Sequence, residues 1–346
     1  MPSTQKALAV QELLGPFVVA EIPVPKPQAG ELLIKVQATA LNPVDWKIQK
    51  RTEVGQFTHL PHILGIDVAG DVEDIGEGVT NFKKGDRVLV QDRWAATGGG
   101  FQQYHITLAA VTAKIPANVS YDDAATIPLG FTTAYVGLYN KKPYGLGLAP
   151  PGSKEGNYAG TPFVILGGSS SVGQMAIQLV KLSGFSPIFT TASLSHTDSL
   201  KSLGATHVLD RNLEPASLAN EIGKVIDVSH IKYIYDSVSL EVTQQQGLHI
   251  LAPGGEMVVD LAPTLNNPDN KVLIRALAVS TLPQNLEIIE EIYQNRISKY
   301  LENGSIKPNR VEVLPNGLAG IPDGLARMEA DQVSRLKLVA HPQETA

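Results

Sequence analysis

The chain has 346 residues, a hydrophobic content of 43%, and 28 Lys and Arg against 34 Asp and Glu, which gives a formal net charge of −6. This length is enough for two domains, and a negative charge without a Lys/Arg cluster argues against binding to nucleic acid, because phosphates require a concentrated positive face. Cysteine is absent, so disulfides, thiolate nucleophiles and sulfur-ligated zinc are excluded.

The N-terminal residues carry no targeting pattern. Residues 1–15 lack a basic segment followed by a continuous apolar core, and no run of about 18 apolar residues occurs in the chain. We therefore expect neither secretion nor a membrane span, and a cytoplasmic protein.

The first third of the sequence has short apolar runs separated by turn residues. Such frequent runs predict a mostly β domain, of β-barrel type, over residues 7–116. The runs that carry this prediction are LLIKVQATAL at 32–41, DVAGDVEDIG at 67–76, DRVLV at 86–90 and AAVTAKI at 109–115.

After Tyr121 the pattern changes to alternating strands and helices. This alternation predicts a parallel sheet covered by helices, a doubly wound α/β fold. The apolar runs are FVIL at 163–166, PIFTT at 187–191, THVLD at 206–210, YIYDSV at 233–238 and EMVVDL at 256–261. An amphipathic segment at 285–306 and a strand-like KLVAH at 337–341 follow.

A glycine–serine turn follows the run at 163–166. Gly168-x-Ser170-x-x-Gly173 is the dinucleotide fingerprint GxGxxG with serine at its middle glycine, and it opens a helical pattern that stops near Gly184. Backbone N–H groups at such a helix start, aided by the helix dipole and by serine hydroxyls, bind a pyrophosphate. The predicted contacts are Gly168, Ser169, Ser170, Ser171, Val172 and Gly173, and a plain strand-to-helix connection is the alternative.

The next strand indicates which dinucleotide binds. NAD-binding folds carry an acid at its end, about 20 residues past the last glycine, where this chain has Ala192. Ser193, His196 and Arg211 could donate hydrogen bonds to a 2′-phosphate that an acid would repel. We therefore predict NADPH, with a solvated loop position for Arg211 as the alternative.

Five blocks in order resemble the medium-chain dehydrogenase/reductase superfamily over nearly the whole chain. They are residues 40–45 (ALNPVD), 64–70 (LGIDVAG), 85–88 (GDRV), 125–138 (ATIPLGFTTAYVGL) and 167–181 (GGSSSVGQMAIQLVK). The glycine–serine turn, its continuation and the PYGLGLAPP insertion are most similar to fungal zinc-free enoyl reductases, including trans-acting partners of polyketide synthases. The quinone oxidoreductase branch shares many of these blocks.

The sequence departs from the family's pattern at the positions of the catalytic zinc ligands. The catalytic zinc ligands of the family's alcohol dehydrogenases, two Cys and one His, align with Asn42, Ile66 and Leu129, and an amide and two alkyl groups cannot replace them. The eight histidines form no HxH or HExxH spacing. We expect no metal.

Without a metal, a nicotinamide cofactor can still reduce an activated C=C bond if the protein stabilises the enolate. The resemblance places Lys47 beside the nicotinamide, where it could stabilise the enolate or organise a proton path. A surface lysine or a cofactor contact alone is the alternative.

Thr133 matches a position beside the nicotinamide, with helix capping by Thr132 or Thr133 as the alternative. Val44, Leu261 and Ser334 are further expected cofactor contacts. We expect Asp45 to stabilise a turn at NPVDWK, and Asp67 to be structural.

The sequence therefore predicts an α/β enzyme with a GroES-like β-barrel-type catalytic domain at 1–125, a Rossmann NADPH-binding domain at 126–282, and a C-terminal return at 283–346, with the active site in the cleft between the domains. The predicted activity is NADPH-dependent reduction of an enone or enoyl thioester without metal. Quinone reduction and a catalytically silent NADPH-binding partner or sensor are the alternatives. An acyl-carrier protein or polyketide synthase is the expected protein partner, and neither nucleic acid nor membrane is expected.

Overall fold

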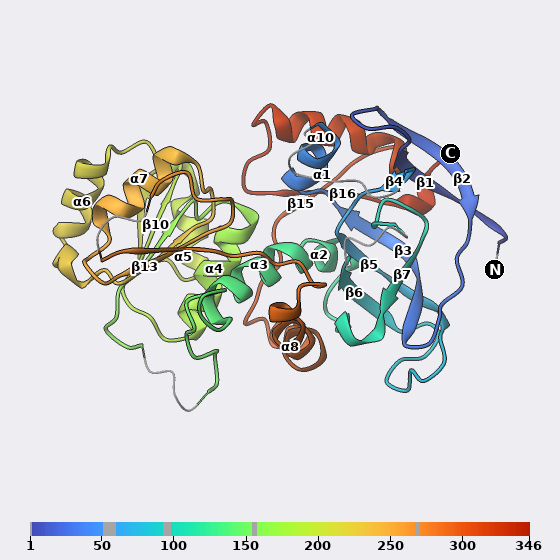
Figure 1. The fold of residues 1–346 in the computed structure, drawn as a ribbon, viewed down its shortest axis with the longest axis horizontal. Helices are drawn as coiled ribbons and strands as arrows, with labels where there is room; N and C mark the ends of the chain where they lie inside the picture. Colours follow the sequence, from blue (N-terminus) through green and yellow to red (C-terminus); the bar gives the residue numbers. More distant parts are fainter. Residues whose placement is uncertain (1, 51–59, 93–97, 154–157, 267–269) are drawn as a thin grey trace. The chain divides into compact units, whose positions relative to one another are not determined.

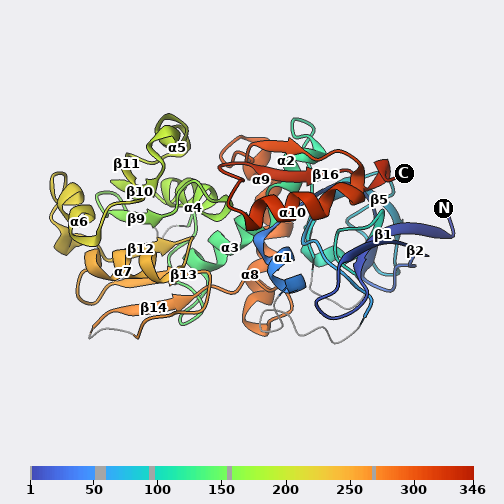
Figure 2. The same ribbon diagram turned by 90° about the horizontal axis from the view of Figure 1, so that it is seen from above.

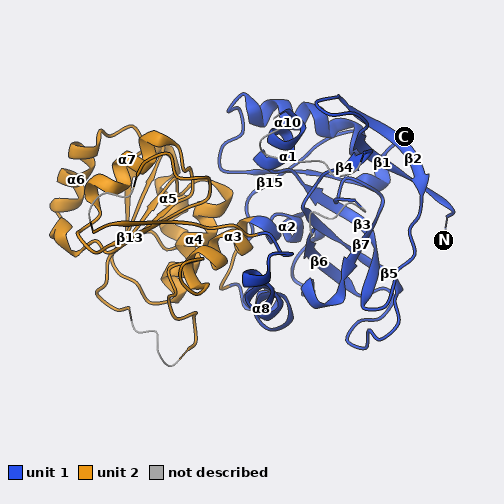
Figure 3. Cartoon of the chain, viewed as in Figure 1, with its two compact units in different colours: residues 1–129, 279–304, 308–346 blue, residues 130–278, 305–307 orange. Residues whose placement is uncertain are grey.

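The structure is a computed structural model that describes residues 2–50, 60–92, 98–153, 158–266 and 270–346. The chain divides into two compact units (Figure 3). The first unit comprises residues 1–129, 279–304 and 308–346, and the second comprises residues 130–278 and 305–307. Within the described residues, no helix is long and apolar enough to cross a membrane.

The first unit is built mainly from β-strands, as predicted (Figure 1). Its strands are β1 (Thr4–Val10), β2 (Phe17–Pro23), β3 (Glu31–Ala40), β4 (His62–Ile63), β5 (Asp67–Ile75), β6 (Arg87–Gln91), β7 (Tyr104–Leu108), β8 (Thr112–Lys114), β15 (Val311–Val313) and β16 (Lys337–Ala340). Its helices are α1 (Pro43–Lys50), α2 (Tyr121–Ala125), α8 (Leu286–Glu291), α9 (Ile297–Glu302) and α10 (Ile321–Glu329).

The longest strand, β3, organises the larger sheet of this unit. The sheet runs β15-β16-β3-β5-β6-β8, and β7 also pairs with β3. Two irregularities interrupt the antiparallel pairing of β3 with β5, between Leu33 and Ile34 and between Val36 and Ala38. Because a bulge bends its strand and increases the twist, these positions curve the sheet. A second sheet, β2-β1-β4, completes the unit.

The amphipathic segment predicted at 285–306 is helical. It consists of α8, a π-helical turn at Ile292–Arg296, and α9. In the π-helical turn, Gln294 Nε2 donates to the carbonyl oxygens of Ala109 and Ala110 at 2.9 and 3.0 Å. These bonds fasten the segment to the chain before β8.

The second unit contains the predicted parallel sheet (Figure 2). Its order is β11-β10-β9-β12-β13-β14 with all pairs parallel, which is the doubly wound order 3-2-1-4-5-6. The strands are β9 (Phe163–Leu166), β10 (Ile188–Ala192), β11 (His207–Asp210), β12 (Tyr233–Asp236), β13 (Glu256–Val259) and β14 (Val272–Arg275). The helices are α3 (Pro128–Tyr139), which starts in the last residues of the first unit, α4 (Ser171–Leu182), α5 (Thr197–Leu203), α6 (Pro215–Gly223) and α7 (Glu241–Ile250).

Helices cover both faces of this sheet, as its uninterrupted apolar strands require. On one face, Val164 and Met257 share an apolar cluster with Leu218 of α6 and Leu248 of α7. On the other face, Gly137 of α3 lies directly against Tyr235 and Val258, where an added Cβ would come within 2.7 Å of the Tyr235 ring. The fold is therefore the predicted Rossmann-type α/β fold joined to a β-rich unit.

Candidate functional site

The glycine–serine turn has the strand–turn–helix context that the fingerprint requires. It connects β9 to α4, and Gly167 adopts a φ of +79° at its start. Ser170 is the N-cap of α4, and its Oγ accepts a hydrogen bond from the Gly173 amide at 2.9 Å. The same hydroxyl donates to Ser237 Oγ at 2.9 Å. Ser170 is thus used to start the helix and to fasten the turn to the end of β12.

Two glycines of the turn allow close backbone approach. A Cβ on Gly168 would lie 2.0 Å from Thr190 Oγ1, and a Cβ on Gly173 would lie 2.3 Å from the Gly167 carbonyl oxygen. Any side chain at either position would push the turn and the helix apart. These positions therefore hold the first turn of α4 tightly against the end of the strand.

The helix start fits a pyrophosphate. The first amides of a helix have no intrahelical acceptor, and here Ser170 caps only the amide of Gly173, which leaves those of Ser171 and Val172 to face a ligand. The positive end of the helix dipole adds to their attraction for an anion. The Ser170 hydroxyl caps the helix, and the contacts of Gly168, Ser169, Ser170, Ser171, Val172 and Gly173 with a dinucleotide stay a prediction.

The ends of β10 and β11 bring the predicted phosphate-binding residues close together. Ala192 and Asp210 are register partners, and the Arg211 amide donates to the Ala192 carbonyl at 3.0 Å. Ser193 follows Ala192, and its Oγ lies 2.9 Å from Ser195 Oγ. Arg211 is exposed. His196 ends the short 3₁₀ turn that follows Ser193.

Leu261 lies at the same edge of the sheet, two residues beyond the end of β13, and is 37% exposed. Beside it is an acidic cluster of which the sequence indicated Tyr235 and Asp236, at a strand end where ligands bind in such sheets, but not Asp260. Tyr235 Oη donates to Asp260 Oδ1 at 2.8 Å, and burial raises the pKa of Asp260 to about 7. Burial likewise raises the pKa of Asp236 to about 6. Acids at consecutive strand ends were the signal in the sequence.

The segment NPVDWK forms the first turns of α1, so the predicted turn is wrong. Asn42 precedes the helix, Pro43 occupies its first position, and Asp45 Oδ2 accepts from the Asn42 amide at 2.8 Å, an arrangement that stabilises a helix start. Asp45 Oδ1 accepts from the Gly65 amide at 3.2 Å. Asp45 is fully buried, and burial raises its pKa to about 7.

Val44 and Lys47 lie on α1 and are both half-buried. Val44 packs against the apolar cluster formed around Leu41 and Ile48. The Lys47 ammonium lies 5.7 Å from the centre of the Trp46 ring, within range of a cation–π interaction. The structure therefore places the two expected cofactor contacts on one helix that Asp45 anchors.

Two of the three positions aligned with zinc ligands, Asn42 and Leu129, contact a buried polar cluster. Asn42 Nδ2 donates to Asp67 Oδ2 at 2.9 Å, while Lys337 Nζ lies 2.5 Å from Asn42 Oδ1 and 2.8 Å from Asp67 Oδ2. The Leu129 amide donates to Asp67 Oδ1 at 2.7 Å. The side chains of Lys337 and Asp67 are 2% and 0% exposed. An ammonium group thus neutralises the buried carboxylate.

Lys337 was missed by the sequence analysis. In the sequence, Lys337 is the charged first residue of the apolar segment KLVA, and its ion-pair partner Asp67 lies 270 positions earlier. In the described part of the chain, no group of three or more His, Cys, Asp or Glu side chains is arranged to hold a metal ion.

Thr132 and Thr133 lie inside α3, so the helix-capping alternative is wrong for both. Thr133 is 8% exposed, and its carbonyl oxygen lies 3.0 Å from Tyr235 Oη. Ser334 is exposed in the loop between α10 and β16 of the first unit.

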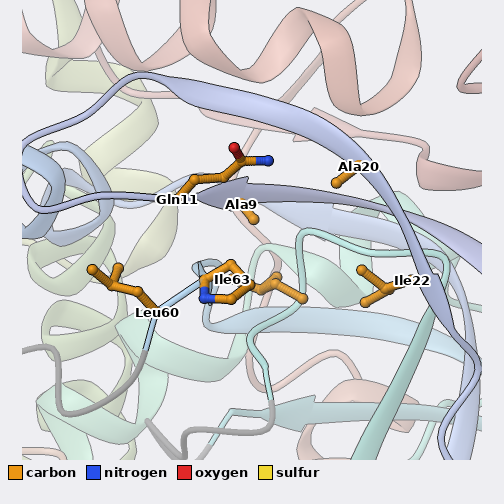
Figure 4. Close-up of a pocket in the computed structure, with 7 residues that line it drawn as sticks. Ala9, Gln11, Ala20, Ile22, Leu60 and Ile63 are labelled. Carbon is orange, nitrogen blue, oxygen red and sulfur yellow. The ribbon is translucent and has the colours of Figure 1, made fainter.

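A separate cavity of about 450 Å³ lies in the first unit beside the sheet β2-β1-β4 (Figure 4). Its lining is mostly apolar, and none of the predicted site residues belongs to it. The lining residues are Ala9, Gln11, Ala20, Ile22, Leu60, Pro61 and Ile63.

The fold and the turn are typical of a dinucleotide-binding protein, and sequence comparison shows the family. Residues 28–117 match the alcohol dehydrogenase GroES-like domain, and residues 171–263 match the zinc-binding dehydrogenase family. The chain belongs to the medium-chain dehydrogenase/reductase family, as the resemblance predicted.

Among relatives, the trans-enoyl reductase himH of Aspergillus japonicus is 33% identical over 321 residues, which cover 89% of each chain. The chloroplast envelope quinone oxidoreductase homolog of Arabidopsis thaliana is 37% identical over 210 residues, which cover 60% of each chain. A mycobacterial protein solved in complex with NADPH superposes with a TM-score of 0.79 at 23% identity, covering 97% of this chain and 100% of that one. The chain is thus an oxidoreductase of this family with a Rossmann-type domain.

Proposed function

We propose that the chain reduces the C=C bond of an α,β-unsaturated carbonyl compound with NADPH and without a metal ion. The observation that carries the metal-free assignment is the Asn42–Asp67–Lys337 cluster. Asn42 and Asp67 are already hydrogen-bonded within it, Ile66 and Leu129 offer only alkyl side chains, and the Lys337 ammonium would repel a divalent cation.

Ala192, Ser193 and Arg211 support the choice of NADPH over NADH. β10 ends at Ala192, which is not an acid, and its register partner Asp210 accepts from the amide and the side chain of Asn212 through Oδ1. The exposed Arg211 guanidinium is available to a 2′-phosphate, which a planar fork of N–H donors recognises well.

In the proposed reaction, the bound cofactor supplies a hydride to the carbon β to the carbonyl. The negative charge that develops on the carbonyl oxygen needs a donor, and we assign that role to the Lys47 ammonium. Thr133 is assigned to hold the substrate carbonyl or the nicotinamide carboxamide. The proton needed at the α carbon arrives through Lys47 or from solvent. Asp45 contributes by anchoring the start of α1.

The substrate is proposed to be a free enone or an enoyl thioester presented by an acyl-carrier protein, which the relative named trans-enoyl reductase supports. Comparing the rates at which an enoyl pantetheine thioester and the same acyl group on a carrier protein are reduced would test whether the enzyme requires a carrier-bound substrate. Quinone reduction is the second candidate, because another relative is named a quinone oxidoreductase homolog.

The deciding experiment follows NADPH oxidation with an enone, with a quinone, and with neither. Oxidation with the enone and analysis of the saturated ketone as product would support the proposal. Oxidation only with quinones would select the second candidate. Tight NADPH binding without turnover of either substrate would indicate a silent cofactor-binding protein.

A further inference from the structure

A buried cluster at the carboxyl ends of β12 and β13 has one polar atom whose hydrogen-bonding capacity is not used. Tyr235 is a residue of β12, and its Oη donates to Asp260 Oδ1 at 2.8 Å. The same Oη lies 3.0 Å from the carbonyl oxygen of Thr133 in α3. The Asp260 amide donates to Ser239 Oγ at 2.7 Å. Asp260 is thus held from both sides, with its backbone and one carboxylate oxygen fixed.

The second acid of the cluster is fully satisfied. Asp236 Oδ1 accepts from the amides of Val238 and Ser239 at 3.0 and 2.8 Å, and its Oδ2 accepts from Thr243 Oγ1 at 2.7 Å. These bonds are typical of an acid that stabilises the loop after a strand.

Asp260 differs because its Oδ2 is buried and has no hydrogen-bond partner within the described residues. Leaving a buried carboxylate oxygen without a donor is costly, and such an atom in a native fold points to a partner outside the protein chain, such as a ligand, an ion or a water molecule. Burial raises the pKa of Asp260 to about 7, the Tyr235 hydroxyl lowers it, and the nearby Asp236 raises it. The group therefore changes charge near neutral pH.

The position of Asp260 indicates which part of a dinucleotide would meet it. A doubly wound sheet consists of two mononucleotide-binding halves, and the dinucleotide lies across the carboxyl ends of both. The pyrophosphate turn and the Ser193–Arg211 pair lie on the half formed by β9, β10 and β11. The half formed by β12, β13 and β14 is left for the nicotinamide, and Leu261, an expected cofactor contact, directly follows Asp260.

We propose that Asp260 binds the nicotinamide end of the dinucleotide through Oδ2, accepting a hydrogen bond from the carboxamide N–H, and that its negative charge favours the oxidised, cationic ring over the reduced, neutral ring. The inference rests on the proposed use of a nicotinamide dinucleotide. It assigns this chain a residue that discriminates between the two redox forms of its cofactor.

The expected pH dependence follows from the charge of the ring. Above the pKa of Asp260 its carboxylate attracts the cationic ring, and below that pKa the neutral acid does not. Affinity for NADP⁺ should therefore rise as pH increases through about 7, whereas affinity for NADPH should change little. The groups that act on this titration are Tyr235 and Asp236.

The test measures dissociation constants of NADP⁺ and NADPH, by calorimetry and by cofactor fluorescence, between pH 6 and pH 8.5 for the wild type and Asp260→Asn. The variant keeps an oxygen for Tyr235 to donate to but loses the charge. We expect NADP⁺ binding at high pH to weaken about tenfold, NADPH binding to change about twofold or less, and the pH dependence of their ratio to disappear.

Asp210→Asn is the matched control, because it removes a charge from the same edge of the sheet at the end of β11. Both redox forms share the adenosine half, so the NADP⁺/NADPH ratio should stay unchanged. Tyr235→Phe is the second variant: since the Tyr235 hydroxyl lowers the pKa of Asp260, its loss should move the NADP⁺ profile to higher pH.

A ratio that is independent of pH in the wild type, or the same in Asp260→Asn, would overturn the inference and leave the proposed function standing. A wild-type protein that binds neither form would overturn both. The wild-type pH profile decides the matter even if Asp260→Asn does not fold.

Discussion

Replacing Lys337 by methionine should strongly destabilise the first unit. The substitution keeps most of the apolar length of the side chain but removes the ammonium that lies 2.8 Å from Asp67 Oδ2 and 2.5 Å from Asn42 Oδ1. Both charged side chains are almost completely buried, so Asp67 would be left as an uncompensated charge inside the protein. Breaking such a pair typically costs about 3–5 kcal/mol of unfolding free energy.

Urea unfolding followed by tryptophan fluorescence measures this effect in the right place. The sequence contains two tryptophans, both within residues 1–129, so the signal reports on the first unit. Lys84→Met is the matched control, because Lys84 forms an ion pair of the same length with Glu73 but is exposed on the surface. Exposed pairs contribute little, so this control should unfold like the wild type.

The double variant Asp67→Asn/Lys337→Met separates charge from packing. It removes both charges, so it should recover part of the stability lost in Lys337→Met. An unfolding free energy for Lys337→Met within about 1 kcal/mol of the wild type would refute the argument. The buried ion pair would then not be what stabilises this cluster.

The remaining predictions concern the cofactor, the metal, catalysis and pH. Arg211→Ala should weaken NADPH binding by about 1.5–3 kcal/mol and leave NADH binding nearly unchanged, and equal losses in the two titrations would contradict the phosphate-binding role. Activity should survive dialysis against a chelator, whereas activity that is lost and then restored by zinc would overturn the metal-free proposal. Lys47→Ala should slow single-turnover hydride transfer about a hundredfold at saturating cofactor and enone, and an unchanged rate with weaker binding would leave Lys47 as a cofactor contact only. Burial raises the pKa of Asp45 from 3.8 to about 7, so the folded state binds one more proton than the unfolded state between these pH values. The free energy of unfolding should therefore fall as pH rises from 3.8 to about 7. Asp45→Asn should remove about 1.4 kcal/mol per pH unit of this dependence, measured by urea unfolding at several pH values.

The fold could be predicted from the sequence because its signals are local. The run at 163–166, the glycines of the turn and the helical spacing that follows are contiguous, and each has one favourable conformation. The segment at 272–275 was not predicted as β14, because VLIR is short and only its pairing with β13 makes it a strand. The error at NPVDWK has a similar cause, since an Asp three residues after Asn suits both a turn and a helix start.

The site was less predictable because its decisive contacts join distant segments. Lys337 and Asp67 are 270 positions apart, and nothing near either residue in the sequence indicates that they pair. Tyr235 and Asp260 likewise meet only because β12 and β13 are neighbours in the sheet. Sequence spacing could suggest the residue types at strand ends, but the distribution of hydrogen bonds among them required the structure.

Asp67 and Asp260 are both acids with buried carboxylate oxygens, but they differ in how many of these oxygens have a hydrogen-bond partner. Asp67 receives donors on both oxygens, from Leu129, Asn42 and Lys337, so each of its oxygens has a partner within the fold. Asp260 is positioned just as firmly by Tyr235, but one of its oxygens is left without a donor in a buried place. Since folding gains nothing from that open acceptor, its retention at the ligand-binding edge of the sheet is best explained by a bound N–H group. The same reasoning about hydrogen-bond partners underlies both proposals, that the first cluster holds no metal and that the second binds the cofactor.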